Sequence, residues 1–162
     1  MRKAFLALLC VAGLGLPVLA DETAPADPSP AAMTFAGQFS DDQLSGMLSR
    51  IGARQQPMMA LSQLDGAVVA AVFDAEIDRA VAAYGPQWQR NMALAWTGLM
   101  TDDEFISLTV EGADSAAAEK YAGLRNEAGQ GMQKLSSDLF QQILAEVIQN
   151  TIKELGVEGT TQ

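Results

Sequence analysis

Apolar residues recur every three or four positions near the end of the chain, the spacing that places side chains on one face of an α-helix. This stripe consists of Leu139, Phe140, Ile143, Leu144, Val147, Ile148, Ile152 and Leu155. A helix with one such face buries it against other elements. The stripe therefore predicts a helical domain in which the last helix packs along at least one other. An apolar groove over this stripe would require part of it to stay exposed.

Two short segments predict helix starts. Residues 40–43 (SDDQ) and 101–104 (TDDE) each place a hydroxyl residue three positions before Gln or Glu, the pattern of a capping box. At an offset of 61, residues 35–44 also align with residues 96–105. This alignment indicates a faint two-fold internal repeat, in which a short capped helix precedes a long one. Two unrelated capping boxes would explain the same pattern.

A long helix is expected in the middle of the chain. Pro57 suits the first turn of a helix, where its missing N–H group costs nothing. We expect this helix to continue to Tyr84. Its residues 67–73 are apolar on all sides, which predicts a central, covered position.

Glycine and proline predict further helix boundaries. Gly85-Pro86 indicates that one helix ends and another begins. Ser115 is expected to cap a final helix, which Gly129 and Gly131 would kink or split. The sequence thus predicts an all-α fold of about five helices, packed as antiparallel helical hairpins.

The first 20 residues have the features of a cleavable export signal. Arg2 and Lys3 form a cationic start, residues 4–16 are apolar or glycine, and a helix-breaking Pro17 precedes a cleavage site at Ala20. An uncleaved anchor is the alternative, although the apolar run of 13 residues is short of the ~20 that span a bilayer. We therefore predict a periplasmic or secreted protein, exported by the general secretory route, without a membrane span after cleavage.

The remaining chain divides by composition. Residues 21–34 are rich in proline and alanine and predict a flexible, disordered tether. Residues 35–156 are long enough for a single helical domain with its own core, and residues 157–162 are expected to be a flexible tail.

Charge and composition exclude several classes of partner and reaction. Removal of Arg2, Lys3 and Cys10 with the signal leaves eight basic against 20 acidic residues, a net charge of −12, and no cysteine. Such a polyanion repels nucleic acid. Because the chain has no histidine, it lacks the usual zinc ligands and the imidazole of a catalytic triad. We therefore expect no cofactor and no enzymatic activity.

Carboxylates offer one enzymatic alternative. Asp74 and Asp78 lie at i and i+4, beside Glu76 and Arg79, and such a pair could serve a glycan-acting enzyme. A solvated helix face explains the same residues, because nothing apolar nearby would raise the pKa of one carboxyl group selectively.

Methionines and aromatic residues suggest a binding surface. The candidate partner-binding residues are Met58, Met59, Trp88, Trp96, Phe140 and Ile148. Methionine is adaptable and is common both in helical cores and on surfaces that bind protein segments. A copper(I) site of thioethers is the alternative use of Met47, Met58, Met59, Met92, Met100 and Met132.

The residues after Thr101 carry a family resemblance. The segments 101–105 (TDDEF) and 115–121 (SAAAEKY) resemble an uncharacterised family of exported bacterial proteins, the domain-of-unknown-function family twenty-fifty-nine. The matching positions are Thr101, Glu104, Ser115 and Lys120, within residues 90–150. Ala116 stands where the family favours proline, and the aromatic pair before the serine is lacking. The resemblance implies a helical fold and export, and it implies no activity.

These observations favour an exported, non-enzymatic helical protein that binds a protein partner or a second copy of itself in the bacterial envelope. The alternatives are a holdase-like chaperone with a methionine-lined apolar groove, and the carboxylate-dependent glycan-acting enzyme.

Overall fold

The structure is a computed structural model that describes residues 27–157, and these residues form an all-α fold without β-strands. The predicted fold class is confirmed, with six α-helices in this range where about five were expected. They are α1 (Pro30–Gly37), α2 (Ser40–Gly52), α3 (Gln56–Ala60), α4 (Gly66–Trp96), α5 (Asp102–Glu111) and α6 (Ala118–Glu154), with short 3-10 turns η1 (Leu61–Gln63) and η2 (Gly112–Asp114). The predicted export signal, residues 21–26 of the tether and residues 158–162 of the tail lie outside the described residues.

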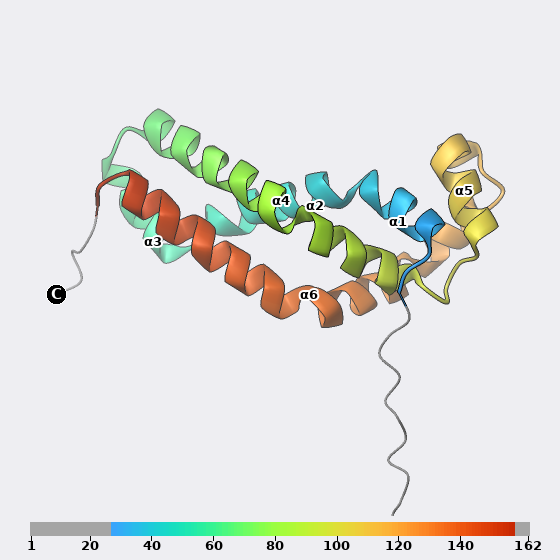
Figure 1. The fold of residues 1–162 in the computed structure, drawn as a ribbon. Helices are drawn as coiled ribbons and strands as arrows, with labels where there is room; N and C mark the ends of the chain where they lie inside the picture. Colours follow the sequence, from blue (N-terminus) through green and yellow to red (C-terminus); the bar gives the residue numbers. More distant parts are fainter. Residues whose placement is uncertain (1–26, 158–162) are drawn as a thin grey trace, which may run out of the picture.

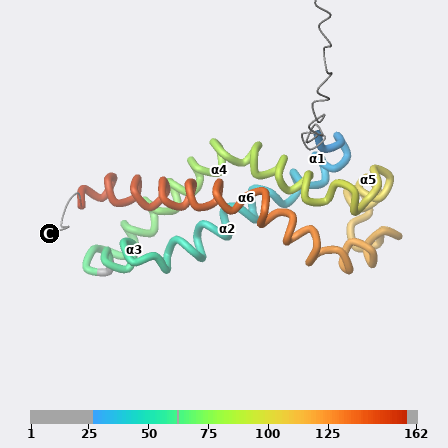
Figure 2. Tube along the Cα trace, turned by 90° about the horizontal axis from the view of Figure 1, so that it is seen from below, coloured from blue at the N-terminus to red at the C-terminus, as the bar shows by residue number. Residues whose placement is uncertain are grey.

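The two long helices organise the molecule. Figure 1 shows α4 and α6 side by side, with the chain running in opposite directions along them. Helix α2 also packs on α4, whereas α2 and α6 barely contact one another. Figure 2 shows α1 and α5 at one end of the long helices and α3 at the other. Helix α4 is therefore the central element, covered on one side by α2 and on another by α6.

The core lies along α4. The side chains of Leu44 and Leu48 from α2, Trp88 from α4, and Ile143 and Val147 from α6 are buried together. Burying side chains of this size contributes about 1.5–3 kcal/mol each relative to exposure. The predicted apolar stripe of the last helix is thus buried in this core.

A buried polar contact fixes the register of α4 against α6. The side-chain amide of Asn91 donates to the Ser136 hydroxyl (3.0 Å) and to the Leu135 carbonyl (3.1 Å). Because buried polar groups need partners, this pairing favours one alignment of the two helices.

Helix α4 differs from the expectation at both ends. Pro57 does begin a helix, but that helix is the short α3, and α4 starts only at Gly66. The predicted boundary at Gly85-Pro86 is wrong, because α4 continues through both residues to Trp96. The Pro86 ring is exposed, and the buried residues on either side of it hold the helix together despite one lost hydrogen bond.

The central position expected for residues 67–73 is also wrong. They form the first turns of α4 at one end of the molecule, where Val68 is 52% exposed. Only Phe73 of this segment is buried, against Gly52 at the end of α2 and beside Leu144. The segment was expected to be covered because of its composition, but α2 ends before it can cover the first turns of α4.

The two predicted capping boxes have different outcomes. Thr101 caps α5 as expected: its hydroxyl accepts from the Glu104 N–H, and the Glu104 carboxylate accepts from the Thr101 N–H. Ser40 is instead the first residue of α2, is buried, and makes no cap. Only two residues separate α1 from α2, so the chain enters α2 directly and Phe39 occupies the capping position. The predicted repeat is not tested by this difference and stays a prediction.

One further boundary differs from the expectation, and one open alternative is decided. Residues 30–34, expected within the tether, belong to α1, where Ser29 caps the helix and Ala32 is buried. Of the kink or split expected from Gly129 and Gly131, the split does not occur: α6 runs through both residues and bends (Figure 2). A Cβ at Gly131 would lie 3.4 Å from the Ala95 Cα, so this glycine serves the close approach of α6 to α4.

The start of α6 lies later than expected. The helix begins at Ala118, and the Ser115 hydroxyl accepts from the Ala117 N–H in the turn before it. Ser115 therefore stabilises the turn before α6, and Ala117 occupies the N-cap position of the helix.

Candidate functional site

The strongest candidate site is a groove between α2 and α6, with α4 beneath it. It consists of two adjoining cavities of about 220 Å³ and about 420 Å³, which share Gln43, Gly129 and Met132 as lining residues. We call these cavities together the α2–α6 groove. The smaller cavity is lined by Phe35, Phe39, Gln43, Met92, Ala95, Trp96, Tyr121, Arg125, Ala128, Gly129 and Met132. The larger is lined by Gln43, Met47, Ile51, Trp88, Gly129, Met132, Gln133, Ser136, Ser137, Phe140 and Gln141.

The groove forms because α2 and α6 both pack on α4 but barely contact one another. Gln43, Met47 and Ile51 are spaced four residues apart, so they lie along one edge of α2. Leu44 and Leu48, one position further, are buried against α4 instead. On the opposite wall, the groove follows α6 from Tyr121 to Gln141, about 30 Å along the helix axis at 1.5 Å per residue. The groove therefore has the length of a helix of about five turns.

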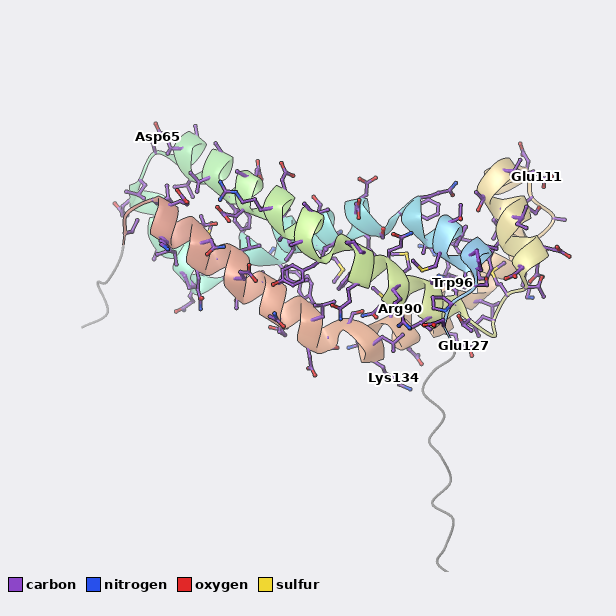
Figure 3. The ribbon with its side chains drawn as sticks, viewed as in Figure 1. Asp65, Arg90, Trp96, Glu111, Glu127 and Lys134 are labelled. Carbon is purple, nitrogen blue, oxygen red and sulfur yellow. The ribbon has the colours of Figure 1, made fainter. Side chains whose placement is uncertain are left out.

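Aromatic rings form one end of the groove. Trp96 stacks on Tyr121 with their ring centroids 4.7 Å apart, and Phe35 packs edge-on against both rings, at 6.5 Å and 5.5 Å. Figure 3 shows Trp96 at the end of α4, and the neighbouring Phe39 is 47% exposed. This aromatic end presents apolar surface that solvent can reach.

The structure brings together three of the six predicted partner-binding residues. Trp88, Trp96 and Phe140 line the groove, although each is largely buried. Ile148 is buried in the core, and Met58 and Met59 lie on α3, outside the groove. The stripe on α6 is buried or half-buried throughout, so no apolar groove runs along it, and only Phe140 contributes to the α2–α6 groove.

Several groove residues were missed by sequence reasoning. The missed residues with large side chains are Phe35, Phe39, Tyr121 and Arg125, whereas Met47, Met92 and Met132 had been named only for the copper(I) alternative. The four-residue spacing of Gln43, Met47 and Ile51 was a usable signal, because it separates an exposed edge of α2 from its buried edge.

The methionines do not form one cluster. Met47, Met92 and Met132 line the groove, Met58 and Met59 lie on α3, and Met100 is buried after α4. Figure 3 shows sulfur atoms in the interior between the helices. Since the six thioethers lie in separate parts of the fold, they do not gather into a single soft-metal site.

A second, charged cavity of about 340 Å³ lies between α4 and α6. Glu76, Arg79, Glu146, Lys153 and Glu154 line it, together with Asn150 and three apolar residues. Asp74 and Asp78 are exposed, as a solvated face predicts, but Glu76 is only 2% exposed and forms an ion pair with Arg79. The expectation that Glu76 belongs to the solvated face is therefore wrong.

Tyr84 contacts this region as well. Its hydroxyl donates a 2.6 Å hydrogen bond to the Glu146 carboxylate, and this bond raises the pKa of Tyr84 above its ordinary value. The arrangement links the two long helices at the edge of the charged cavity.

Metal-binding clusters and membrane-spanning helices are both absent from residues 27–157. In this range no three acidic, cysteine or histidine residues gather closely enough to hold a metal ion. None of its helices combines the length and apolar character needed to cross a membrane.

The residues that carried the family resemblance meet at the corner between α5 and α6. The Lys120 ammonium donates to both oxygens of Glu104 (2.9 Å and 2.8 Å), and the Thr101 N–H donates to the same carboxylate (2.8 Å). The Ser115 hydroxyl shares a 2.7 Å hydrogen bond with Ser107. These four residues join one helix end to the next.

Comparison with known proteins finds no matching family model, no matching curated protein and no matching solved structure. The resemblance in residues 90–150 therefore stays a prediction, and the α2–α6 groove is the feature that points to a function.

Proposed function

We propose that this protein is exported and serves in the bacterial envelope as a non-enzymatic binding protein, which takes an amphipathic helical segment of a partner protein into the α2–α6 groove. The observation that carries the proposal is the lining of the groove, where aromatic side chains and methionines lie beside uncharged glutamines and serines. Grooves of this composition bind the apolar face of a helix. The signal at residues 1–20 supports the location.

The arrangement of helices supports a helical occupant. Helices α2 and α6 both pack on α4 and barely contact one another, so a further helix between them would complete a four-helix arrangement. The length of the groove, about 30 Å, suits a helix of about 18–20 residues. The two cavities would receive the apolar side chains of that helix.

A peptide titration tests the proposal. The probe is an amidated peptide of about 18 residues, with leucine on one helical face and glutamine and alanine on the other. Both tryptophans of the chain line the groove, so binding should change their fluorescence. A matched peptide with the same composition in scrambled order should bind at least about tenfold more weakly, since it lacks an apolar face.

Two glycine variants supply the decisive control. A Cβ at Gly129, which lines both cavities, or at Gly123, which lines neither, would meet no atom within 4 Å. Gly129→Tyr should therefore obstruct the groove without disturbing the fold, and Gly123→Tyr should leave binding unchanged. Equal peptide binding by the two variants would contradict the proposed function.

The methionines in the groove support an alternative form of this function, in which the protein is a holdase-like chaperone that accepts many apolar segments. Met47, Met92 and Met132 line the middle of the groove, and flexible thioethers adapt to different side chains. If the groove is a holdase site, peptides with different apolar faces should bind with similar affinity. A dedicated partner site should instead separate them by about tenfold or more.

The charged cavity offers less support for a glycan-acting enzyme. Such an enzyme needs one carboxyl group protonated and a second ionised. Glu76 is the buried carboxylate of the cavity, and it is already paired with the Arg79 guanidinium. Release of sugar from glycan polymers that is lost in Glu76→Gln would favour the enzyme over the binding protein.

A further inference from the structure

The α2–α6 groove differs in charge from the rest of the chain. Acidic residues outnumber basic ones by 20 to 10 in the full sequence. Yet none of the residues that line the two cavities is acidic, and Arg125 is the one charged residue among them. The groove is thus a neutral to positive surface on an acidic protein.

Arg125 forms no ion pair with an acidic residue of the described range. Within residues 27–157, Arg79, Arg90 and Lys120 form ion pairs with Glu76, Asp27 and Glu104, whereas Arg125 forms none. Its side chain is exposed and lines the aromatic end of the groove beside the stacked Trp96 and Tyr121. A guanidinium in this position can make two parallel hydrogen bonds to a carboxylate that arrives from outside.

From the charge of the groove, and on the basis of the proposed function, we propose that the bound segment carries a carboxylate next to its apolar face, and that Arg125 pairs with this carboxylate at the aromatic end. The pair sets the direction of the segment, because the opposite orientation would leave Arg125 without its partner. The acidic surface elsewhere repels the same carboxylate, which strengthens the preference for this end of the groove. The carboxylate can belong to an Asp or Glu side chain or to a chain terminus.

The test extends the peptide titration. One series replaces single glutamines of the amphipathic peptide with glutamate, with the C-terminus amidated. A second series keeps the glutamines and leaves the C-terminus as a free carboxylate. We expect at least one acidic peptide to bind about fivefold to tenfold more tightly than the neutral peptide, and this advantage to shrink with added salt. The series that shows the advantage identifies the source of the carboxylate.

Arg125→Gln should bind the acidic and the neutral peptide with equal affinity, because the advantage of the acidic peptide depends on the guanidinium. Lys134→Gln is the matched control: Lys134 lies on the same helix, is exposed and lines neither cavity, and Figure 3 shows it on the outer side of α6. The control should keep the full advantage. Circular dichroism of both variants checks that α6 is intact.

The outcomes separate the two proposals. If acidic and neutral peptides bind equally, or if Arg125→Gln and Lys134→Gln behave alike, the carboxylate proposal is overturned and the helix-binding function stands. If no amphipathic peptide binds, or if Gly129→Tyr leaves binding unchanged, the helix-binding function fails and the carboxylate proposal fails with it.

Discussion

Trp96 at the end of α4 stacks on Tyr121 in the first turn of α6, with the ring planes inclined by 24°. The two residues are separated by the whole of α5, so the contact closes a loop of 24 intervening residues and holds the start of α6 against the end of α4. The same pair forms one end of the α2–α6 groove. Packing of the core and shape of the candidate site therefore depend on the same rings.

Trp88 connects α4 to α2 by a side-chain hydrogen bond, whereas the Trp96 indole makes none within residues 27–157. The Trp88 indole N–H donates to the Gln43 side-chain carbonyl at 3.1 Å, and the ring is 2% exposed. Trp88→Phe should lower the free energy of unfolding by about 1–3 kcal/mol, since it loses both ring volume and a hydrogen bond. Urea denaturation followed by circular dichroism measures the change. Trp96→Phe is the control with a similar loss of volume. An equal loss of stability in both variants would mean that the hydrogen bond from Trp88 to Gln43 does not stabilise the fold.

The capping-box pattern forms a cap at Thr101 but not at Ser40, so alanine substitutions at the two positions should differ in their effect on stability. Thr101→Ala removes an N-cap and should destabilise the protein by about 1 kcal/mol. Ser40→Ala should change the free energy of unfolding by less than half of that, because Ser40 makes no cap and its hydroxyl has only a 3.4 Å contact with Asp41. Thermal denaturation of both variants compares them directly. A larger effect at Ser40 than at Thr101 would contradict the cap assignment.

Glu104 should make stability depend on pH in the acid range. The hydrogen bonds from the Lys120 ammonium, and then from the Thr101 N–H, hold the pKa of Glu104 below its ordinary value of 4.5. A lowered pKa in the folded state stabilises the fold above the unfolded pKa, and this contribution is lost as the pH falls through the folded pKa. The wild type should therefore be more stable than Glu104→Gln at about pH 7, and the difference should narrow toward about pH 3.

Urea denaturation at several pH values measures this narrowing. Lys120→Met is the matched variant, since it removes the largest cause of the lowered pKa and should reduce the same pH dependence. A stability difference between the wild type and Glu104→Gln that stays constant from neutral to acid pH would contradict the prediction.

Substitutions at Gly52 and Gly46 distinguish the effect of close packing from the effect of helix propensity within α2. A Cβ at Gly52 would lie 2.6 Å from the ring of buried Phe73, which is closer than a van der Waals contact allows. Gly52→Ala should therefore overpack this site and destabilise the protein by about 1–3 kcal/mol. A Cβ at Gly46 would meet nothing within 4 Å, and Gly46→Ala should stabilise the helix by up to about 1 kcal/mol. Thermal denaturation measures both changes. Stabilisation by both substitutions would show that the Phe73 ring can move away.

Local patterns predicted some of these features and failed on others for identifiable reasons. The TDDE segment caps α5, because an irregular turn precedes it and leaves the helix end to the side chains. The similar SDDQ segment has α1 only two residues before it, so the backbone path replaces the side-chain cap. At Gly85-Pro86 the stop signal is outweighed by packing: buried residues such as Ile77 and Trp88 lie on both sides of it and hold α4 continuous.

The candidate site was predicted only in part. Trp88, Trp96 and Phe140 are large apolar residues on helical faces, so composition was enough to select them. Arg125 and Tyr121 could not be selected in this way, because their importance comes from rings and helices that are distant in the sequence. Met58 and Met59 were selected for composition alone, and the structure places them on α3.

The sequence by itself determined the all-α class, the cap of α5 and the strongly acidic character, because each depends on neighbouring residues or on composition. Only the tertiary structure decided that α4 passes through Pro86, that residues 67–73 lie at an end, and that a groove without acidic side chains lies between α2 and α6. The physical reason is that helical periodicity states which face of a helix is apolar, whereas the lengths and crossing of the other helices decide how much of that face they cover.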